Sequence, residues 1–322
     1  MPKKCLIIGL GQIGMGYDLT LDLGAFVYCH AKAFSVHQAF ELSGAVDSSE
    51  KQRNLFELHY KKPGFLNLSE AFQKIKPEVV VIATPTKTHL AVLEKVLGQC
   101  QPEAILCEKP LAYDVEEARK MVEVCDKAGA KLFVNYMRRS DSGCVELKKR
   151  IESGEISSPI KGVAWYSKGF LHNGSHLFNL LEFWLGAFKK AKVLDEGRLL
   201  DDLDSEPDVQ VEFDRGKIVF LAGWEEEFSH CTIELLSPSG RLRYEKGGGT
   251  IAWQATTPDP RISGYKILQA EPEIIANGMG RSQYHVAEQL ANAFAGRQHT
   301  LCTGREALAT IEAMHKIIHQ RS

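Results

Sequence analysis

Two histidines, His172 and His176, are the first candidates for chemistry in this chain. They flank Asn-Gly-Ser in the stretch FLHNGSHLFNLLEFWLG at residues 170–186. From His176 onward apolar residues recur at helical spacing, so we expect a buried helix that begins near 174–175 and ends before Gly186. His176 would then lie in the first helical turn, where the positive end of the helix dipole disfavours an imidazolium. That position suits a neutral histidine that accepts a proton.

Histidines at this spacing can also bind zinc, but only when both lie on one face of a helix. Asn173-Gly174 is a poor helix interior, and no Cys-rich or HExxH segment nearby supplies further ligands. We therefore expect no metal site. A structural role in the core or at a helix cap remains the alternative for both histidines, and more so for His172.

A glycine-rich turn near the start of the chain is typical of dinucleotide binding. It reads Gly9-Leu-Gly11-Gln-Ile-Gly14 and follows a strand-like apolar run at 4–10. A second such run ends in Asp47, which is the context that a Rossmann fingerprint requires. Gly9 would permit the tight turn, Gly11 the close approach of a pyrophosphate, and Gly14 close packing.

The spacing within this fingerprint is unusual. Asp47 lies 33 residues after Gly14, whereas the acidic residue of such fingerprints usually follows about 20 residues on. The stretch 16–29 (GYDLTLDLGAFVYC) looks like an insertion at the mouth of the cofactor cleft, where it would cover the cofactor or shape the substrate site. Asp47 would bond ribose hydroxyls and repel a 2′-phosphate, which favours NAD over NADP, unless it is only a strand-end turn residue.

These motifs need elements that position them, and the first half of the chain alternates strands with helices. Continuous apolar strands between helices indicate a doubly wound parallel sheet, which binds ligands at the carboxyl ends of its strands. We expect strands at 4–10, 41–47, 78–84, 104–108 and 131–136, and helices at 31–40, 50–58, 69–76, 87–98 and 115–128.

The second half has short strand-like runs joined by tight turns, such as those at 214–216 and 238–240. Such hairpin spacing favours antiparallel pairing. The expected strands are 161–167, 191–194, 209–213, 217–223, 232–236 and 241–244.

Composition excludes several classes of function. A chain of 322 residues with 44% hydrophobic and 25% charged residues is typical of a two-domain globular protein. Its formal net charge of -2 argues against a nucleic-acid partner, and no apolar run is long enough for a membrane span. Eight cysteines without a CxxC pair, and no secretory signal, indicate reduced thiols and a cytoplasmic protein.

Three further motifs follow strand ends: ATPTKTH at 83–89, EKP at 108–110 and NYMRR at 135–139. Together with the glycine fingerprint, GSHLFNLLEFWLG and the closing TGREALATIEAMHKII, they resemble the glucose–fructose oxidoreductase/inositol dehydrogenase (Gfo/Idh/MocA) family over essentially the whole chain. The resemblance implies an NAD(P)-binding Rossmann domain at 1–137 and an α/β domain at 138–322 with a large, mostly antiparallel sheet. That sheet would bind substrate and form a homodimer or homotetramer, and the helix at 304–320 would pack back on the first domain.

Hydride transfer between a carbinol carbon and a nicotinamide needs a group that takes the hydroxyl proton and a cation or donor that stabilises the alkoxide. The resemblance assigns the first role to His176 and the second to Lys109, which could otherwise be a surface lysine. The family pattern D-x-G-x-H-x-x-D places its acidic positions at His172 and Asn179. A neutral His172 would therefore modify catalysis, because it supplies no fixed negative charge.

The resemblance also implies the residues that would surround the reacting groups. Cofactor contacts would come from the glycine fingerprint with Gln12 and Ile13, and from Asp47, Thr84, Pro85, His89, Glu108 and Lys109. Substrate contacts would come from Tyr136, Arg138, Arg139, Lys168, Asn173 and Asn179, although the two arginines could equally form interdomain salt bridges.

We therefore expect an NAD-dependent oxidoreductase, with NADP the less expected cofactor. It would act on a hydroxyl or keto carbon of a sugar, polyol or nucleotide-sugar, and saccharide biosynthesis is the setting that the arginine pair and the altered family pattern favour. The alternative from another class is a catalytically silent dinucleotide-binding regulator or scaffold, because both acidic positions of the family pattern are changed. A second enzymatic alternative is reduction of an imine or a conjugated double bond.

Overall fold

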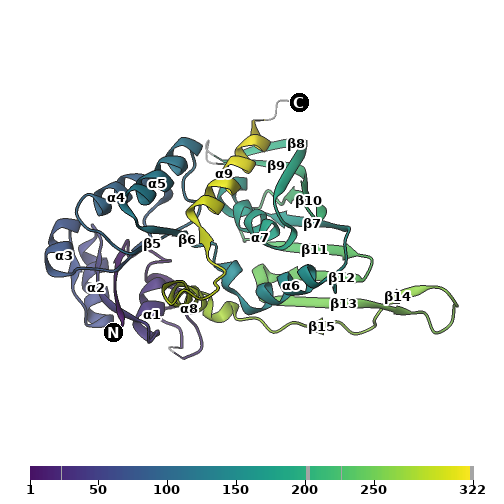
Figure 1. Ribbon diagram of the computed structural model, residues 1–322, viewed down its shortest axis with the longest axis horizontal. Helices are drawn as coiled ribbons and strands as arrows, with labels where there is room; N and C mark the ends of the chain where they lie inside the picture. The colour runs from purple at the N-terminus through teal and green to yellow at the C-terminus, as the bar shows by residue number, and fades with distance from the viewer. Residues whose placement is uncertain (23, 201–203, 226, 320–322) are drawn as a thin grey trace. The chain divides into compact units, whose positions relative to one another are not determined.

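A computed structural model of the chain describes all residues except 23, 201–203, 226 and 320–322 (Figure 1). The chain divides into two compact units. Unit 1 comprises Met1–Ser140 and Gly280–Ile311, and unit 2 comprises Asp141–Met279 and the residues from Glu312 on. We expected a single boundary after residue 137. In the structure, unit 1 extends to Ser140 and the chain returns to it at Gly280. None of the helices in the described part of the chain has the length and apolarity that a membrane span needs.

Unit 1 contains a seven-stranded sheet in the order β16-β6-β5-β4-β1-β2-β3, parallel except for β16. The order reverses at β1, which pairs with both β2 and β4, and this switch point is where open α/β sheets bind ligands. The strands are β1 Lys3–Ile8, β2 Phe40–Val46, β3 Gly64–Phe65, β4 Val79–Ile82, β5 Ala104–Cys107, β6 Lys131–Val134 and β16 Cys302–Thr303. The doubly wound parallel sheet predicted from the sequence is confirmed.

Helices cover both faces of this sheet because successive strand residues point to opposite sides and are apolar on both. One face packs against α3 Leu68–Lys74, α4 His89–Leu97, α5 Val115–Ala128 and the start of α9 Gly304–Ile318. The other packs against α1 His30–Val36, α2 Glu50–Tyr60 and α8 Ser282–Phe294. The sequence patterns did not predict α8. In α9, Ala307 and Ile311 belong to the unit 1 core.

Unit 2 contains a nine-stranded sheet in the order β14-β13-β12-β11-β7-β10-β9-β8, with β15 paired to β13. Among the strands that the structure describes in this sheet, only the pair β7–β10 is parallel, so the mostly antiparallel sheet is confirmed. Its strands are β7 Ile160–Tyr166, β8 Phe188–Leu200, β9 Asp204–Phe213, β10 Gly216–Ala222, β11 Thr232–Ser237, β12 Gly240–Glu245, β13 Thr250–Pro258, β14 Lys266–Leu268 and β15 Glu273–Ile274.

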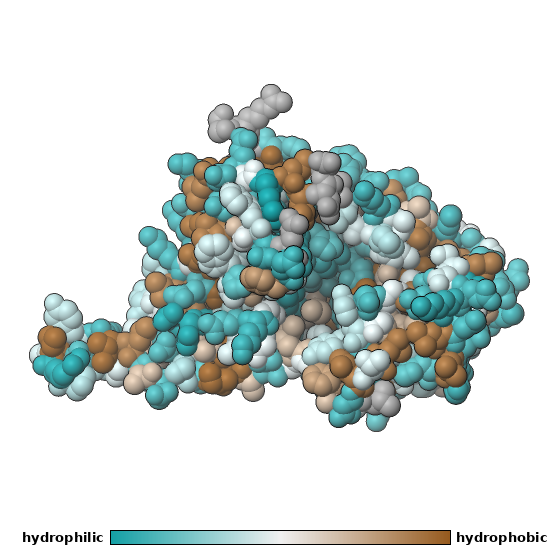
Figure 2. Space-filling view, turned by 180° about the vertical axis from the view of Figure 1, so that it is seen from behind, coloured by the Kyte–Doolittle hydropathy of each residue, from teal (hydrophilic) through white to brown (hydrophobic). Residues whose placement is uncertain are grey.

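One face of this sheet is covered by α6 Ser142–Ser153 and α7 Ser175–Leu185. Phe178 of α7 packs against Phe213 and Phe220 of the sheet, and Trp184 packs edge-on against Tyr244. The sequence predicted α7 and its end at Gly186 but not α6. The hairpin β13–β14 extends from the sheet (Figure 1), and Figure 2 shows hydrophobic residues on this arm. Ile262, Tyr265 and Ile267 in this part of the chain are exposed.

Candidate functional site

A cavity of 990 Å³ lies in unit 1 at the carboxyl ends of β1, β2 and β4. Its position is the one that the sheet topology predicts for a ligand. Of the expected cofactor contacts, Gly9, Gly11, Gln12, Ile13, Asp47, Thr84 and Pro85 lie in its wall. The wall also contains residues that sequence reasoning missed, including Tyr17, Ser48, Asn67, Thr88 and Lys95. Tyr17, Ser48, Asn67 and Thr88 follow the glycine turn or strand ends, which is the signal that could have pointed to them, whereas Lys95 lies within α4.

The three fingerprint glycines meet different surroundings. A Cβ at Gly9, whose φ is +97°, would lie 2.6 Å from the carbonyl oxygen of Ala83, and one at Gly14 would lie 2.1 Å from that of Gly9. Both positions therefore require glycine for the fold itself. A Cβ at Gly11 would meet nothing within 4 Å. Gly11 thus leaves an open face on the cavity, which is what the approach of a pyrophosphate to the backbone needs.

The insertion is looped out of a helix whose hydrogen bonds continue across it. In an uninterrupted α-helix, residues 17 and 18 would donate to the carbonyls of Ile13 and Gly14. Here His30 and Ala31 make those two bonds, at 3.0 and 2.9 Å. His30 therefore takes the place of residue 17, and 13 residues, 17–29, form an excursion. Without them Asp47 would follow Gly14 by 20 residues, which is the usual spacing of the fingerprint.

The base of this excursion is closed by a buried carboxylate. Asp18, which is 1% exposed, accepts the backbone N–H groups of Tyr28 at 2.6 Å and Cys29 at 2.9 Å. Val27 donates its N–H to the carbonyl of Gly280, and Arg281 donates to the carbonyl of Gly24. The excursion is thus fastened within unit 1, and it places Tyr17, 57% exposed, in the cavity wall.

Asp47 ties the end of β2 to the glycine turn. One carboxylate oxygen accepts the N–H of Leu10 at 2.7 Å, and the other accepts that of Ser49 at 2.7 Å. Arg53 donates to the carbonyl oxygens of Asp47 and Ser48 at 2.8 and 2.9 Å. Because each carboxylate oxygen has two acceptor positions, Asp47 can still accept the hydroxyls of a ribose in the cavity.

Four expected cofactor contacts do not line this cavity: Gly14, His89, Glu108 and Lys109. His89 is 1% exposed, and its ring nitrogens lie 3.0 and 2.9 Å from the carbonyls of Leu111 and Thr84. Burial lowers the pKa of His89, although both carbonyl contacts favour its charged form. His89 therefore connects the loop after β4 to the segment after β5. Its role in cofactor binding stays a proposal.

Glu108 is also buried, next to the half-buried Lys109. Its Oε1 lies 2.7 Å from Nε2 of His30 and accepts the side-chain N–H of Asn135 at 2.6 Å. Its Oε2 accepts the backbone N–H of Lys109 at 3.3 Å. Burial by itself would raise the pKa of Glu108, but contact with His30, together with Asn135 and Lys109, lowers it below its ordinary value.

The two histidines of the opening motif lie in unit 2 on one continuous helical stretch. His176 is the second residue of α7, as predicted, but Gly169–Gly174 form a π-helical turn directly before it. Gly174 has helical dihedral angles (φ -57°, ψ -33°), so the backbone runs on without a break. Our expectation that 173–174 interrupts the helix was therefore wrong. The α-helix itself begins at Ser175, as predicted, and the π-helical turn extends the helical stretch back to Gly169.

Two buried carboxylates of β9 accept the N–H groups at this earlier helix start. Asp204 accepts from Leu171 at 2.9 Å and from His172 at 2.8 Å, and Glu206 accepts from Gly169 at 2.9 Å. These carboxylates thus meet the positive end of the helical stretch at its start. The alternating acids at 204, 206 and 208 were the missed sequence signal, because every second residue of a strand shares a face.

Burial raises the pKa of Asp204 to about 6, with the nearby Glu206 adding to the effect against the two backbone donors. In the same segment, His172 is exposed, His176 and Asn173 are half-buried, and Asn179 is buried one turn further on. Lys168 immediately precedes the π-helical turn with a positive φ of 63°. No group of three or more potential metal-ligating side chains occurs in the part of the chain that the structure describes.

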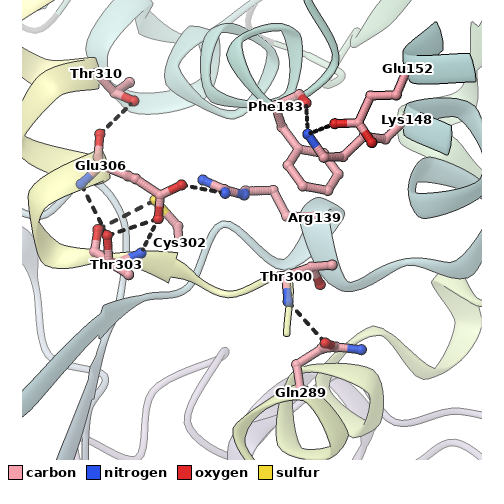
Figure 3. Close-up of polar contacts among 10 residues, drawn as sticks. All are labelled: Arg139, Lys148, Glu152, Phe183, Gln289, Thr300, Cys302, Thr303, Glu306 and Thr310. Carbon is pink, nitrogen blue, oxygen red and sulfur yellow. Dashed lines mark hydrogen bonds and ion pairs between the residues drawn. The ribbon is translucent and has the colours of Figure 1, made fainter. Parts of the chain in front are cut away.

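The residues expected to open the substrate site lie at the end of unit 1 and are buried. Tyr136 is 3% exposed, and Arg138 and Arg139 are each 8% exposed. Arg139 forms an ion pair with Glu306 at 2.6 Å, and Glu306 also accepts the N–H and hydroxyl of Thr303 at 2.8 Å each (Figure 3). Both ends of this ion pair belong to unit 1, so it is not the interdomain bridge that we considered. Substrate binding by these arginines stays a proposal.

Residues 3–136 match the model of the GFO_IDH_MocA family, described as an oxidoreductase family with an NAD-binding Rossmann fold. Inositol 2-dehydrogenase of Rubrobacter xylanophilus is 38% identical over 98 residues, which are 30% of this chain and 28% of that enzyme. The NAD(+)-dependent scyllo-inositol 2-dehydrogenase of Bacillus subtilis is 28% identical over 66% of this chain and 64% of its own length. The chain thus spans less than two thirds of these relatives in the matched regions.

The fold of the whole chain is similar to that of solved structures. The WlbA dehydrogenase of Bordetella pertussis, solved with NADH and UDP-GlcNAcA, superimposes with a TM-score of 0.74 at 18% identity. The superposition covers 98% of this chain and 95% of that one. The fingerprint, the cavity at the switch point and the match to the family model agree, and we conclude that residues 3–136 form an NAD-binding Rossmann domain of the Gfo/Idh/MocA family of oxidoreductases.

Proposed function

We propose that the chain is an NAD-dependent oxidoreductase that transfers a hydride between nicotinamide and a CH–OH or keto carbon of a sugar, polyol or nucleotide-sugar. The observation that carries the proposal is the cavity at the switch point of unit 1, with the open face of Gly11 and the Asp47 carboxylate in its wall. Gly11 can receive a pyrophosphate and Asp47 a ribose diol, whereas a 2′-phosphate would meet the negative charge of Asp47. A relative named scyllo-inositol 2-dehydrogenase, and a dehydrogenase of the same fold solved with UDP-GlcNAcA, support the substrate class.

The proposed chemistry divides between three side chains. Bound NAD would supply the hydride acceptor in the oxidative direction. His176 would take the hydroxyl proton, and the Lys109 ammonium would stabilise the negative charge that develops on that oxygen. His172, exposed and on the same helical stretch as His176, would pass the proton on towards solvent. Tyr136, Lys168, Asn173 and Asn179 are proposed to contact the substrate.

The test combines cofactor binding with turnover. We expect NADH to bind with a quenching of protein fluorescence, and Lys109→Ala to abolish NAD-dependent oxidation of inositols or UDP-sugars while NADH binding survives. Lys74→Ala is the matched control, because Lys74 is an exposed lysine of the same unit that pairs with Glu70 on its own helix and lies over the ring of Phe65. Turnover retained in Lys109→Ala would remove this lysine from the mechanism, and failure to bind NADH would refute the function itself.

We also propose a cytoplasmic homo-oligomer. All eight cysteines are free thiols, which suits a reducing compartment. The sheet face of unit 2 opposite α6 and α7 exposes Trp165 (41%) and Leu236 (51%), and large apolar side chains on an open sheet face favour association with another copy. The mass in solution measured by light scattering, compared with that of Trp165→Asp, tests the assembly. A monomeric wild-type protein would refute it.

A further inference from the structure

A buried polar cluster in unit 1 lies directly beside Lys109. Its members come from four elements: Glu108 follows β5, Asn135 follows β6, His30 begins α1 and Gln283 lies in the first turn of α8. All four are at most 8% exposed. Glu108 Oε1 receives both His30 Nε2 (2.7 Å) and Asn135 Nδ2 (2.6 Å), and the same Asn135 nitrogen donates to Gln283 at 3.1 Å. The donors of the cluster thus converge on one carboxylate.

This arrangement is not what stability alone would select. Nδ1 of His30 and Oδ1 of Asn135 are buried and have no hydrogen-bond partner among the described residues. A buried polar atom without a partner costs free energy, and apolar residues of similar volume often fill such a place at no loss. A cluster that leaves two such atoms in order to hold one carboxylate ionised therefore points to a use for that negative charge.

The negative charge of Glu108 contacts Lys109 in two ways. Oε2 of Glu108 accepts the backbone N–H of Lys109, and the side chains of the two residues attract each other electrostatically. The other titratable groups near this carboxylate are His30, His89 and Cys107. His30 also donates its backbone N–H to Ile13 in the cavity wall. The same residue thus links the glycine turn to the support of Lys109.

We propose that Glu108 is a positioning residue, whose carboxylate, held by His30 and Asn135, fixes the backbone of Lys109 and keeps its amine protonated. The inference rests on the proposed function, in which the Lys109 ammonium stabilises an alkoxide. The insertion contributes to this arrangement. His30, which takes the place of residue 17 in the helical hydrogen bonds, is the residue that follows the insertion and begins α1. The carboxylate would act through Lys109 and not on the substrate.

The pKa of Lys109 can be measured without substrate, by trace acylation of the protein over a range of pH and quantification of each lysine peptide by mass spectrometry. Glu108→Gln removes the negative charge at constant shape, so we expect the pKa of Lys109 to fall by about one unit, with roughly tenfold faster labelling at neutral pH. Glu78→Gln is the matched control. Glu78 pairs with Lys3 at 2.9 Å, so its loss should lower the pKa of Lys3 and leave Lys109 unchanged.

Two variants of His30 keep the proposal testable if Glu108→Gln does not fold. The amide of His30→Gln can still donate to Glu108, so the pKa of Lys109 should match that of the wild type. His30→Leu removes the donor, the carboxylate then holds a proton over more of the pH range, and the pKa of Lys109 should fall. An unchanged Lys109 in folded Glu108→Gln, or equal values in the two His30 variants, would overturn the proposal.

The outcome is separable from that of the proposed function. If the pKa of Lys109 responds to Glu108 but Lys109→Ala retains full turnover, the positioning stands and the catalytic role of Lys109 falls. If Lys109→Ala is inactive and the pKa of Lys109 ignores Glu108, the catalytic role stands and the positioning falls. Circular dichroism melting of Glu108→Gln and of Lys109→Ala, compared with the wild type, shows in either case whether the fold is intact.

Discussion

Asp204 offers a prediction whose magnitude follows from the structure. It is 4% exposed, and burial raises its pKa from 3.8 to about 6 in the folded protein. A difference of about 2.2 units corresponds to about 3 kcal/mol. Because the folded pKa is the higher one, this stabilising contribution is complete below pH 3.8 and is lost as the pH rises through 6. Above pH 6 the ionised Asp204 therefore costs unit 2 about 3 kcal/mol relative to its protonated form.

Asp204→Asn removes this titration but keeps the shape of the side chain. The amide has one acceptor oxygen for the two N–H groups of Leu171 and His172, so one hydrogen bond is lost at a cost of about 1 kcal/mol at every pH. We expect the variant to be less stable than the wild type by about 1 kcal/mol near pH 4 and more stable by about 2 kcal/mol at pH 7. The difference should change most steeply, by about 1.4 kcal/mol per pH unit, between pH 4 and 6.

The assay is urea unfolding followed by tryptophan fluorescence. All four tryptophans of the chain, Trp165, Trp184, Trp224 and Trp253, belong to unit 2, so the signal reports on the unit that contains Asp204. Asp208→Asn is the matched control for the loss of one carboxylate acceptor from the same strand, because Asp208 accepts the N–H of Ala222 at 2.8 Å. A stability difference between Asp204→Asn and wild type that stays constant from pH 4 to 7 would refute the reasoning.

Three further predictions concern the cofactor unit and the histidines. Gly11→Ala should fold with an unchanged melting temperature and bind NADH at least tenfold more weakly, whereas Gly14→Ala should destabilise unit 1 because its Cβ would collide with the carbonyl of Gly9; normal NADH affinity in Gly11→Ala would contradict the assigned phosphate position. Deletion of residues 17–29 should leave a folded protein in which His30 and Ala31 keep their bonds to Ile13 and Gly14. Deletion of 18–29, which is one residue shorter, shifts the register of these two hydrogen bonds and should unfold unit 1. Circular dichroism melting compares the two deletions; equal melting temperatures would disprove the view that 17–29 is an insertion into a continuous helix. His172→Asp should change NAD-dependent turnover, with an increase if the acidic residue of the family pattern is merely missing and a decrease if His172 carries its own proton-transfer role; unchanged steady-state kinetics would exclude His172 from proton transfer.

The features that depend on neighbouring residues could be predicted from the sequence. The apolar strand runs, the glycine turn, the helix over 175–185 and its end at Gly186 were all correctly placed, because strand burial, turn dihedrals and helical periodicity are local properties. The glycine fingerprint and the strand-end motifs also sufficed for the family. The 33-residue gap before Asp47 showed that something had been inserted, but not how the helix accommodates it.

Contacts between residues far apart in the chain were decided only by the tertiary structure. Nothing near residue 30 announces a bond to Glu108, 78 residues later, and nothing near residue 172 announces the carboxylate of Asp204 beneath its backbone. The helical stretch can begin at Gly169 because Asp204 and Glu206 accept N–H groups of its first turn. Without these carboxylates those N–H groups would need water as a partner. Sequence determined which residues could do chemistry; long-range hydrogen bonds and burial determined which of them are held, and by what.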